Sequence, residues 1–217
     1  MDWNTLQKQA TDRHLKVLGG VHPEAEDDAP TGCRTLVLLG PDEPHFWPAF
    51  TDSPEFLDSA PDSMDRWSTR VIGDWAETLG AKALFPFGGP PYLPFFTWAT
   101  RTGRIHASPI RLLVHDEAGL FVSFRGALAL DISIEMPTAP PRPCKSCVEK
   151  ACLTACPVDA LNDDGYDVAT CKAFLGTTAG NGCMTNGCAA RRACPVSQQW
   201  GRLPAQSAYH MRHFKRN

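Results

Sequence analysis

The stretch "CKSCVEKACLTACPVDAL" (residues 144–161) contains four of the nine cysteines and determines how the second half of the chain is interpreted. Its spacing is Cys144-x2-Cys147-x4-Cys152-x3-Cys156, and Pro157 follows directly. Three thiols on one short loop can wrap around one side of a compact metal cluster, whereas the fourth leaves in another direction. Proline after the fourth cysteine suits the first turn of a helix, because its missing N–H would have no partner there. The spacing therefore predicts three ligands for one cluster and a fourth cysteine, at a helix start, that serves another.

Bacterial ferredoxins use the related run C-x2-C-x2-C-x3-C-P for two [4Fe–4S] clusters. The middle gap is two residues longer here, so the loop through "VEKA" (148–151) must bulge or make a short turn. A second run, "NGCMTNGCAARRACP" (181–195), ends on the same Cys-Pro dipeptide, and "DVATCKAFL" (167–175), which has a helical pattern, holds one more cysteine. Two clusters need eight ligands. The crossed pattern assigns Cys144, Cys147, Cys152 and Cys194 to the first cluster, and Cys156, Cys171, Cys183 and Cys188 to the second.

Two other uses of these cysteines fit the count. Disulfides are disfavoured because the N-terminus, "MDWNTLQKQATDRH", has no apolar signal core, and the chain is expected in the reducing cytoplasm. Two zinc sites of four thiolates each remain an alternative, but zinc ribbons pair C-x2-C knuckles and have no use for a crossing cysteine. We therefore predict two [4Fe–4S] clusters. Cys33 lies far from the others and is expected to be a small buried hydrophobe.

Composition and proline usage suggest the domain organisation. A chain of 217 residues with 43% hydrophobic residues can form one domain of moderate size or two small ones. Four prolines in "EMPTAPPRP" (135–143) predict a stiff linker. Seven basic residues and no acidic residue follow Asp167, and a solvated basic segment explains them more simply than a nucleic-acid site. The predicted parts are an N-terminal domain over 1–135, a linker over 136–143, a two-cluster ferredoxin-like domain over 144–200 and a basic tail over 201–217.

The N-terminal part alternates helix and strand patterns, which predicts an α+β fold. Trp3, Leu6, Ala10, Leu15 and Leu18 approximate one helical face. A long amphipathic helix is expected over 62–79, with Asp62 as N-cap and Gly80 as C-cap. "RTLVLLG" (34–40) and "AKALFPF" (81–87) are strand candidates. "IRLLVHDEAGLFVSF" (110–124) predicts a hairpin, with "ALALDISI" (127–134) as a possible partner strand.

The cysteine pattern with the lone cysteine in "CKAFL" resembles the C-terminal dicluster module of the epoxyqueuosine reductase family and, more distantly, reductive dehalogenases. The resemblance is specific over 143–197, although both later gaps are wider here, and the layout of 97–131 is similar to the segment upstream of that module. It implies a nitroreductase-like N-terminal domain that holds cobalamin, reduced by the clusters. The segment "GRIHASP" (103–109) departs from the family's Gly-Trp-Ile-Gly-Lys pattern, and no counterpart of its acidic proton donor is found, since Asp116, Glu117 and Asp131 lie elsewhere. These departures leave the catalytic residue unknown and cobalamin less favoured than its absence.

Other residues receive a structural interpretation. The aromatic and proline-rich segment 85–98 could form one wall of a cofactor cleft, but packing against the core is the preferred interpretation. His106 and His115 could be ligands or proton donors and are expected to be hydrogen-bonded structural residues instead.

The sequence thus predicts an iron–sulfur redox protein whose two clusters relay single electrons to a site on the N-terminal domain. Such a protein would be an oxidoreductase using a flavoprotein or ferredoxin as its redox partner, with a small-molecule substrate and no nucleic acid. The alternatives are a dedicated electron carrier, whose N-terminal domain docks its partner, and a zinc-stabilised binding module. No run approaches the roughly 18 apolar residues that a membrane span requires, and a cytoplasmic location is expected.

Overall fold

The chain forms two compact units. The computed structural model describes residues 1–162 and 165–216, so 163–164 of the predicted two-cluster domain and Asn217 of the predicted tail lie outside the described residues. The first unit comprises 1–105 and 123–140, and the second comprises 106–122 and 141–217. The boundary at residue 140 falls inside the predicted linker. Residues 106–122 belong with the cysteine-rich unit, whereas the sequence prediction included them in the N-terminal domain.

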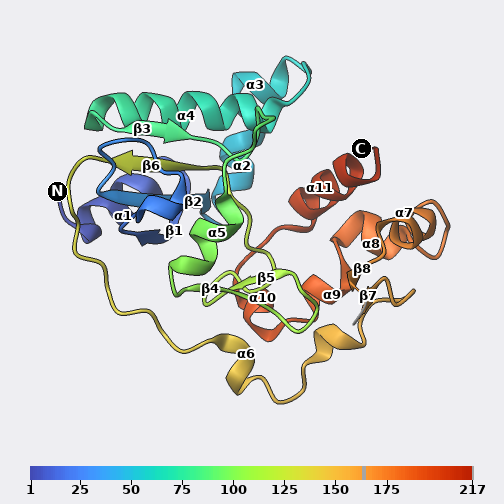
Figure 1. Cartoon of the computed structure of the whole chain (residues 1–217). Helices are drawn as coiled ribbons and strands as arrows, with labels where there is room; N and C mark the ends of the chain where they lie inside the picture. Colours follow the sequence, from blue (N-terminus) through green and yellow to red (C-terminus); the bar gives the residue numbers. More distant parts are fainter. Residues whose placement is uncertain (163–164, 217) are drawn as a thin grey trace. The chain divides into compact units, whose positions relative to one another are not determined.

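An antiparallel sheet organises the first unit (Figure 1). Its strand order is β1 (Leu15–Val21), β2 (Thr35–Pro41), β6 (Gly126–Leu130), β3 (Lys82–Leu84). Every residue of β2 is buried, as expected for a central strand covered on both faces. The strands predicted around 34–40 and 81–87 are confirmed. β6 pairs with β2 and β3, which corrects its predicted pairing with the 110–124 hairpin.

The first unit also contains helices, some of which pack on this sheet. They are α1 (Trp3–Thr11), α2 (Phe46–Thr51), α3 (Pro54–Leu57), α4 (Ser63–Leu79) and α5 (Phe95–Arg101), with a short 3-10 turn at Ala25–Asp27. α4 contacts β3 and β6, while α1 and α5 contact β1. Asp62 and Gly80 occupy the predicted cap positions of α4, although the Asp62 side chain makes no capping hydrogen bond. The predicted continuation of the first helical face to Leu15 and Leu18 is wrong, because His14 adopts a positive φ of 58° that ends the helical path, and both leucines lie in β1.

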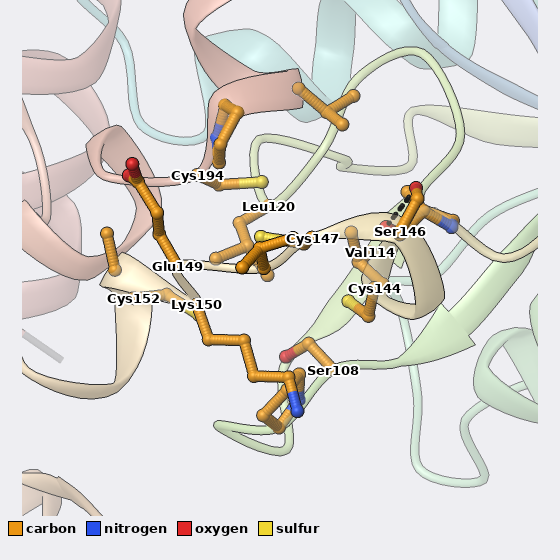
Figure 2. Close-up of a pocket in the computed structure, with 16 residues that line it drawn as sticks. Ser108, Val114, Leu120, Cys144, Ser146, Cys147, Glu149, Lys150, Cys152 and Cys194 are labelled. Carbon is orange, nitrogen blue, oxygen red and sulfur yellow. Dashed lines mark hydrogen bonds between the residues drawn. The ribbon is translucent and has the colours of Figure 1, made fainter.

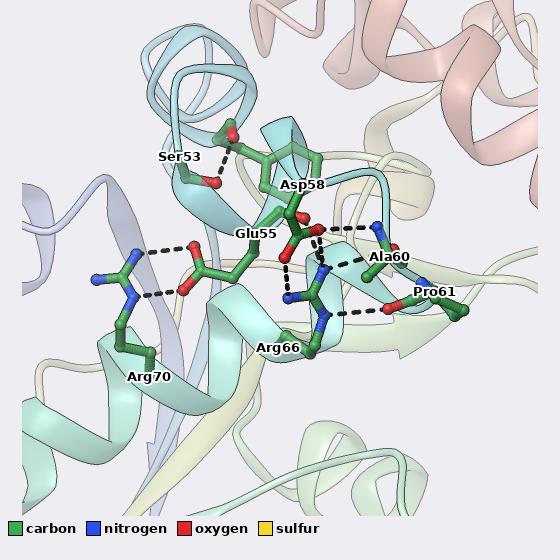
Figure 3. Close-up of polar contacts among 8 residues, drawn as sticks. Ser53, Glu55, Asp58, Ala60, Pro61, Arg66 and Arg70 are labelled. Atoms are coloured by element: carbon green, nitrogen blue, oxygen red, sulfur yellow. Dashed lines mark hydrogen bonds and ion pairs between the residues drawn. The ribbon is translucent and has the colours of Figure 1, made fainter.

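Two arginines of α4 bind the turn around α3 (Figure 3). Arg70 donates two hydrogen bonds to the Glu55 carboxylate, at 2.5 and 3.0 Å, and Arg66 donates two to Asp58, both at 2.7 Å. Arg66 also donates to the carbonyl oxygens of Glu55 and Pro61. Charge-assisted pairs of this bidentate kind hold planar groups in one orientation. They therefore fasten α3 and the following turn to the long helix.

The second unit consists of short elements. They are β4 (Ile105–Ala107), β5 (Leu113–His115), α6 (Pro143–Ser146), a 3-10 turn at Ala151–Leu153, β7 (Leu161–Asn162), β8 (Gly165–Tyr166), α7 (Val168–Leu175), α8 (Asn181–Asn186), α9 (Ala189–Arg192), α10 (Pro195–Gln199) and α11 (Pro204–Arg216). β5 pairs with β4, and β7 pairs with β8. Together with the first unit, these elements give a mixed α+β protein with antiparallel pairing. None of the helices within the described residues is both long and apolar enough to span a membrane.

Two predictions for this unit need correction. The second run of the predicted hairpin, 120–124, is not a strand, because the bridge between His115 and Gly119 already closes the turn. Pro157 begins a turn closed by the Asp159 N–H on the Cys156 carbonyl, not a helix. Most of the basic tail forms α11, which packs against α8 and buries Gln206, Ser207 and Ala208, while its basic residues Arg212, Lys215 and Arg216 are exposed.

Candidate functional site

Four cysteines line one cavity of about 270 Å³ within the second unit. They are Cys144, Cys147, Cys152 and Cys194, and Figure 2 shows them around the same space. Apolar side chains, including Val114 and Leu120, complete the wall, and both are almost fully buried. The members of this group are those that the crossed spacing predicts for the first cluster.

The local backbone explains how the chain presents these thiols. Cys144 lies in the single turn of α6, which begins at Pro143. Lys150 adopts the left-handed conformation, and the 3-10 turn that follows carries Cys152, so the longer middle gap is taken up by a short turn as predicted. Cys194 arrives from a distant part of the chain as the N-cap of α10, with Pro195 as the first helical residue. The second Cys-Pro dipeptide thus behaves as expected, although the first does not.

The thiols of this group influence one another electrostatically. Burial raises the pKa of the Cys144 thiol, and the neighbouring Cys152, Cys194 and Cys147 raise it further. Burial likewise raises the pKa of Cys152, with further contributions from Cys194 and Cys147. Four thiolates brought together in this way would repel each other, so the raised pKa values favour neutral thiols until a positively charged group binds them.

The second group contains Cys156, Cys171, Cys183 and Cys188. Burial raises the pKa of the Cys171 thiol, and the nearby Cys188, Cys156 and Cys183 raise it further. Cys171 lies in α7, Cys183 in α8 and Cys188 at the start of α9. The predicted helix around Cys171 is confirmed. Members of this group are again those of the predicted second set.

A tyrosine hydroxyl contacts the second group. Tyr166 donates a hydrogen bond to the Sγ of Cys171 at 3.3 Å. Burial raises the pKa of this phenol, and the bond to Cys171 raises it further, so the hydroxyl remains a donor. Its ring stacks on Phe214 of α11 with the ring planes 10° apart. Nothing in the local sequence around Tyr166 distinguishes it from any half-exposed aromatic, so the sequence alone does not indicate this contact.

Several cations of the C-terminal segment contact carbonyl oxygens or an aromatic ring of the second unit. Lys215 donates to the carbonyl of Leu175 at 3.2 Å, and Lys172 lies over the Phe214 ring. Arg192 donates to the carbonyl of Gly187, next to Cys188. Their contacts account for part of the basic excess after Asp167.

The turn 115–122 is anchored to the chain around Cys194. The Leu120 N–H donates to Ser197 Oγ at 2.8 Å, and Arg191 donates to the Leu120 carbonyl. Arg202 donates to the Phe121 carbonyl and lies over its ring. Gly119 has a φ of +56°, and a Cβ there would lie 2.6 Å from Ser197 Oγ and closer still to its backbone nitrogen. This turn therefore positions Leu120 in the cavity wall.

Both histidines are expected to be hydrogen-bonded structural residues, and the hydrogen bonds of His115 agree with this expectation. His115 is fully buried, and its Nδ1 accepts hydrogen bonds from the N–H groups of Glu117 and Ala118, both at 3.0 Å. Its Nε2 lies 3.0 Å from Asp116, so the ring organises the turn. His106 is half-buried in the same unit. Glu117 is exposed in that turn, and Asp131 is exposed in the first unit.

The remaining predicted residues lie in the first unit. Cys33 is half-buried, its thiol donates to the Thr35 carbonyl at 3.4 Å, and burial raises its pKa. Part of the aromatic segment 85–98 packs in the core, where Trp98 donates to the Asp27 carbonyl at 2.6 Å. Tyr92 and Phe96 of that segment are exposed. The core-packing interpretation therefore holds for Phe95 and Trp98 of α5, but not for Tyr92 and Phe96.

Within residues 1–162 and 165–216, no three His, Cys, Asp or Glu side chains converge closely enough to hold a single metal ion. A cubane cluster requires less convergence, because each thiolate binds a different iron atom at its own corner.

Comparisons with protein-family models, curated proteins and solved structures found no match to this chain.

Proposed function

We propose that this chain is an iron–sulfur electron-transfer protein with two [4Fe–4S] clusters. The first cluster would be held by Cys144, Cys147, Cys152 and Cys194, and the second by Cys156, Cys171, Cys183 and Cys188. The observation that carries the proposal is the grouping of eight thiols into two sets of four, in which each Cys-Pro cysteine lies with the other motif. When bound, such clusters accept and release single electrons.

The surroundings of the first set suit a cluster. The cavity is walled by apolar side chains and by backbone, and cluster potentials depend on such burial and on hydrogen bonds to sulfur. Single zinc ions are less well supported, because zinc ribbons pair C-x2-C knuckles and have no use for a cysteine that crosses to the other group. The chain's own role would be to hold the thiolates, exclude water and supply compensating positive charge.

More specifically, we propose that the electrons pass to an oxidoreductase site, as the resemblance to epoxyqueuosine reductases implies. A flavoprotein or ferredoxin would supply them. Cobalamin remains the less favoured acceptor, since the family's acidic residue and Gly-Trp-Ile-Gly-Lys segment have no counterpart here. Adding cob(II)alamin to the cluster-loaded protein separates the two functions: a stoichiometric spectral change would favour the reductase, and its absence with fast electron exchange with a flavoprotein would favour the carrier.

The decisive experiment compares four serine variants, three at predicted cluster ligands and one at Cys33. After anaerobic purification, the protein should contain about eight iron atoms and a matching amount of sulfide. Cys144→Ser and Cys194→Ser should perturb the same cluster in electron paramagnetic resonance spectra, although the two positions are far apart in the sequence. Cys183→Ser should perturb the other cluster, and Cys33→Ser should perturb neither. Zinc without visible absorption would refute the proposal, and matching spectra for Cys194→Ser and Cys183→Ser would refute the crossing.

A further inference from the structure

A buried hydroxyl at the first cysteine group has no hydrogen-bond partner. Ser108 is only 7% exposed, and its Oγ makes no hydrogen bond with any described residue. The residue lines the same cavity as Cys144 and the other three thiols, and Figure 2 shows it at the cavity wall. A buried hydroxyl without a partner costs free energy, and such groups in native proteins usually bind something the structure does not contain.

The main chain holds this hydroxyl in place. The Ser108 N–H donates to the Leu112 carbonyl at 2.9 Å, and its own carbonyl accepts from Arg111 at 2.9 Å. Both bonds close the tight loop between β4 and β5, so the residue cannot easily turn towards solvent. Ser108 also lies within the segment 103–109, where the sequence departs from the pattern of the family it resembles.

We propose that Ser108 donates a hydrogen bond to a sulfur of the first cluster and raises its reduction potential. This inference rests on the proposed function. A reduced cluster carries one more negative charge than an oxidised one, so a donor to its sulfur favours the reduced state. In the second group Tyr166 already donates to a cysteine sulfur, which is the corresponding arrangement on the other side of the crossing.

Redox titration followed by electron paramagnetic resonance tests the inference in the full-length, cluster-loaded protein. In Ser108→Ala, the ratio of reduced to oxidised first cluster at the wild-type midpoint should fall about tenfold, a one-electron shift of about 59 mV to lower potential. The second cluster should keep its midpoint. Ser146→Ala is the matched control, because Ser146 lines the same cavity but is exposed and donates to the Pro143 carbonyl at 3.2 Å.

The outcomes separate this inference from the proposed function. Equal first-cluster midpoints in Ser108→Ala and Ser146→Ala, or equal shifts of both clusters, would overturn the role of Ser108. Absence of iron and sulfide from the wild-type protein would overturn the proposed function instead. If Ser108→Ala loses the first cluster, the isosteric pair Ser108→Thr and Ser108→Val replaces it. The role of the hydroxyl is supported if the threonine variant alone keeps the first cluster, or if its first-cluster midpoint potential is higher than that of the valine variant. Identical behaviour of the two variants overturns it.

Discussion

Replacing Gly119 by alanine should open the wall of the first cysteine group. The left-handed conformation at φ +56° costs an ordinary residue about 1–2 kcal/mol. The new Cβ would also overlap the backbone nitrogen and Oγ of Ser197, and overpacking of this kind typically costs about 1–3 kcal/mol. The sum is about 2–5 kcal/mol, and it falls on the contact that joins the turn 115–122 to α10, directly after Cys194.

Two alanine variants isolate the cause. Gly80 has a similar φ of +62° but nothing within 4 Å of its Cβ position, so Gly80→Ala carries the backbone cost without the overlap. Gly182 lies in the cysteine-rich unit with equally open space, so Gly182→Ala controls for a substitution there. Denaturant unfolding followed by circular dichroism, together with iron content, should show Gly119→Ala as the most damaging of the three. If Gly119→Ala matched Gly80→Ala in both measurements, the assigned contact with Ser197 would be refuted.

Three further predictions concern both units. Anaerobic chelation of the metal should make the second unit, residues 106–122 and 141–216, sensitive to protease while the first unit resists cleavage, because the second unit has few large apolar side chains to stabilise it without metal. If mass spectrometry showed both segments fully protected, this prediction would be contradicted. The hydrogen bond from Arg70 holds the pKa of the Glu55 carboxyl below its ordinary value of 4.5. The ionised Glu55 therefore stabilises the fold fully above pH 4.5, and this stabilisation is lost as the pH falls through the lower pKa of the folded state. In unfolding followed by tryptophan fluorescence, Glu55→Gln should reduce the loss of stability at acid pH, whereas Glu77→Gln, at an exposed position, should not. Trp98→Phe should lower the free energy of unfolding by about 1–3 kcal/mol, because the buried Asp27 carbonyl loses its donor, and an unchanged unfolding midpoint would count against that bond.

The cysteine positions and a few strong local patterns made much of this architecture predictable. Spacing alone paired Cys194 with the first motif, and the caps Asp62 and Gly80 marked both ends of α4. These signals are local, or they follow from simple counting of ligands. Strand 34–40 was equally clear, because an uninterrupted apolar run between turn residues indicates a buried strand.

The remainder depended on which surfaces meet, and apolar patterns do not encode that choice. Val114 and Leu120 look like any buried residues in the sequence, so nothing indicated that they line the cysteine cavity rather than the N-terminal core. Ser108 was passed over because a serine is informative only when burial and a missing partner are known. The helical form of the basic end is not predictable from charge alone, because counting charges does not reveal the buried face of α11.

The insertion of residues 106–122 into the second unit has a consequence for how the protein is made and divided. On a ribosome, strand β6 emerges after this segment, although it lies between β2 and β3, so the first sheet cannot close until the segment has been synthesised. The segment must then wait for residue 141 onward before its own partners exist. A fragment beginning at the proline-rich linker would therefore carry all eight clustered cysteines but lack Val114 and Leu120 from the cavity wall. Neither unit can be cut out as one continuous piece, and a permuted chain that joins 106–122 to the second unit through a new linker would be the way to obtain it alone.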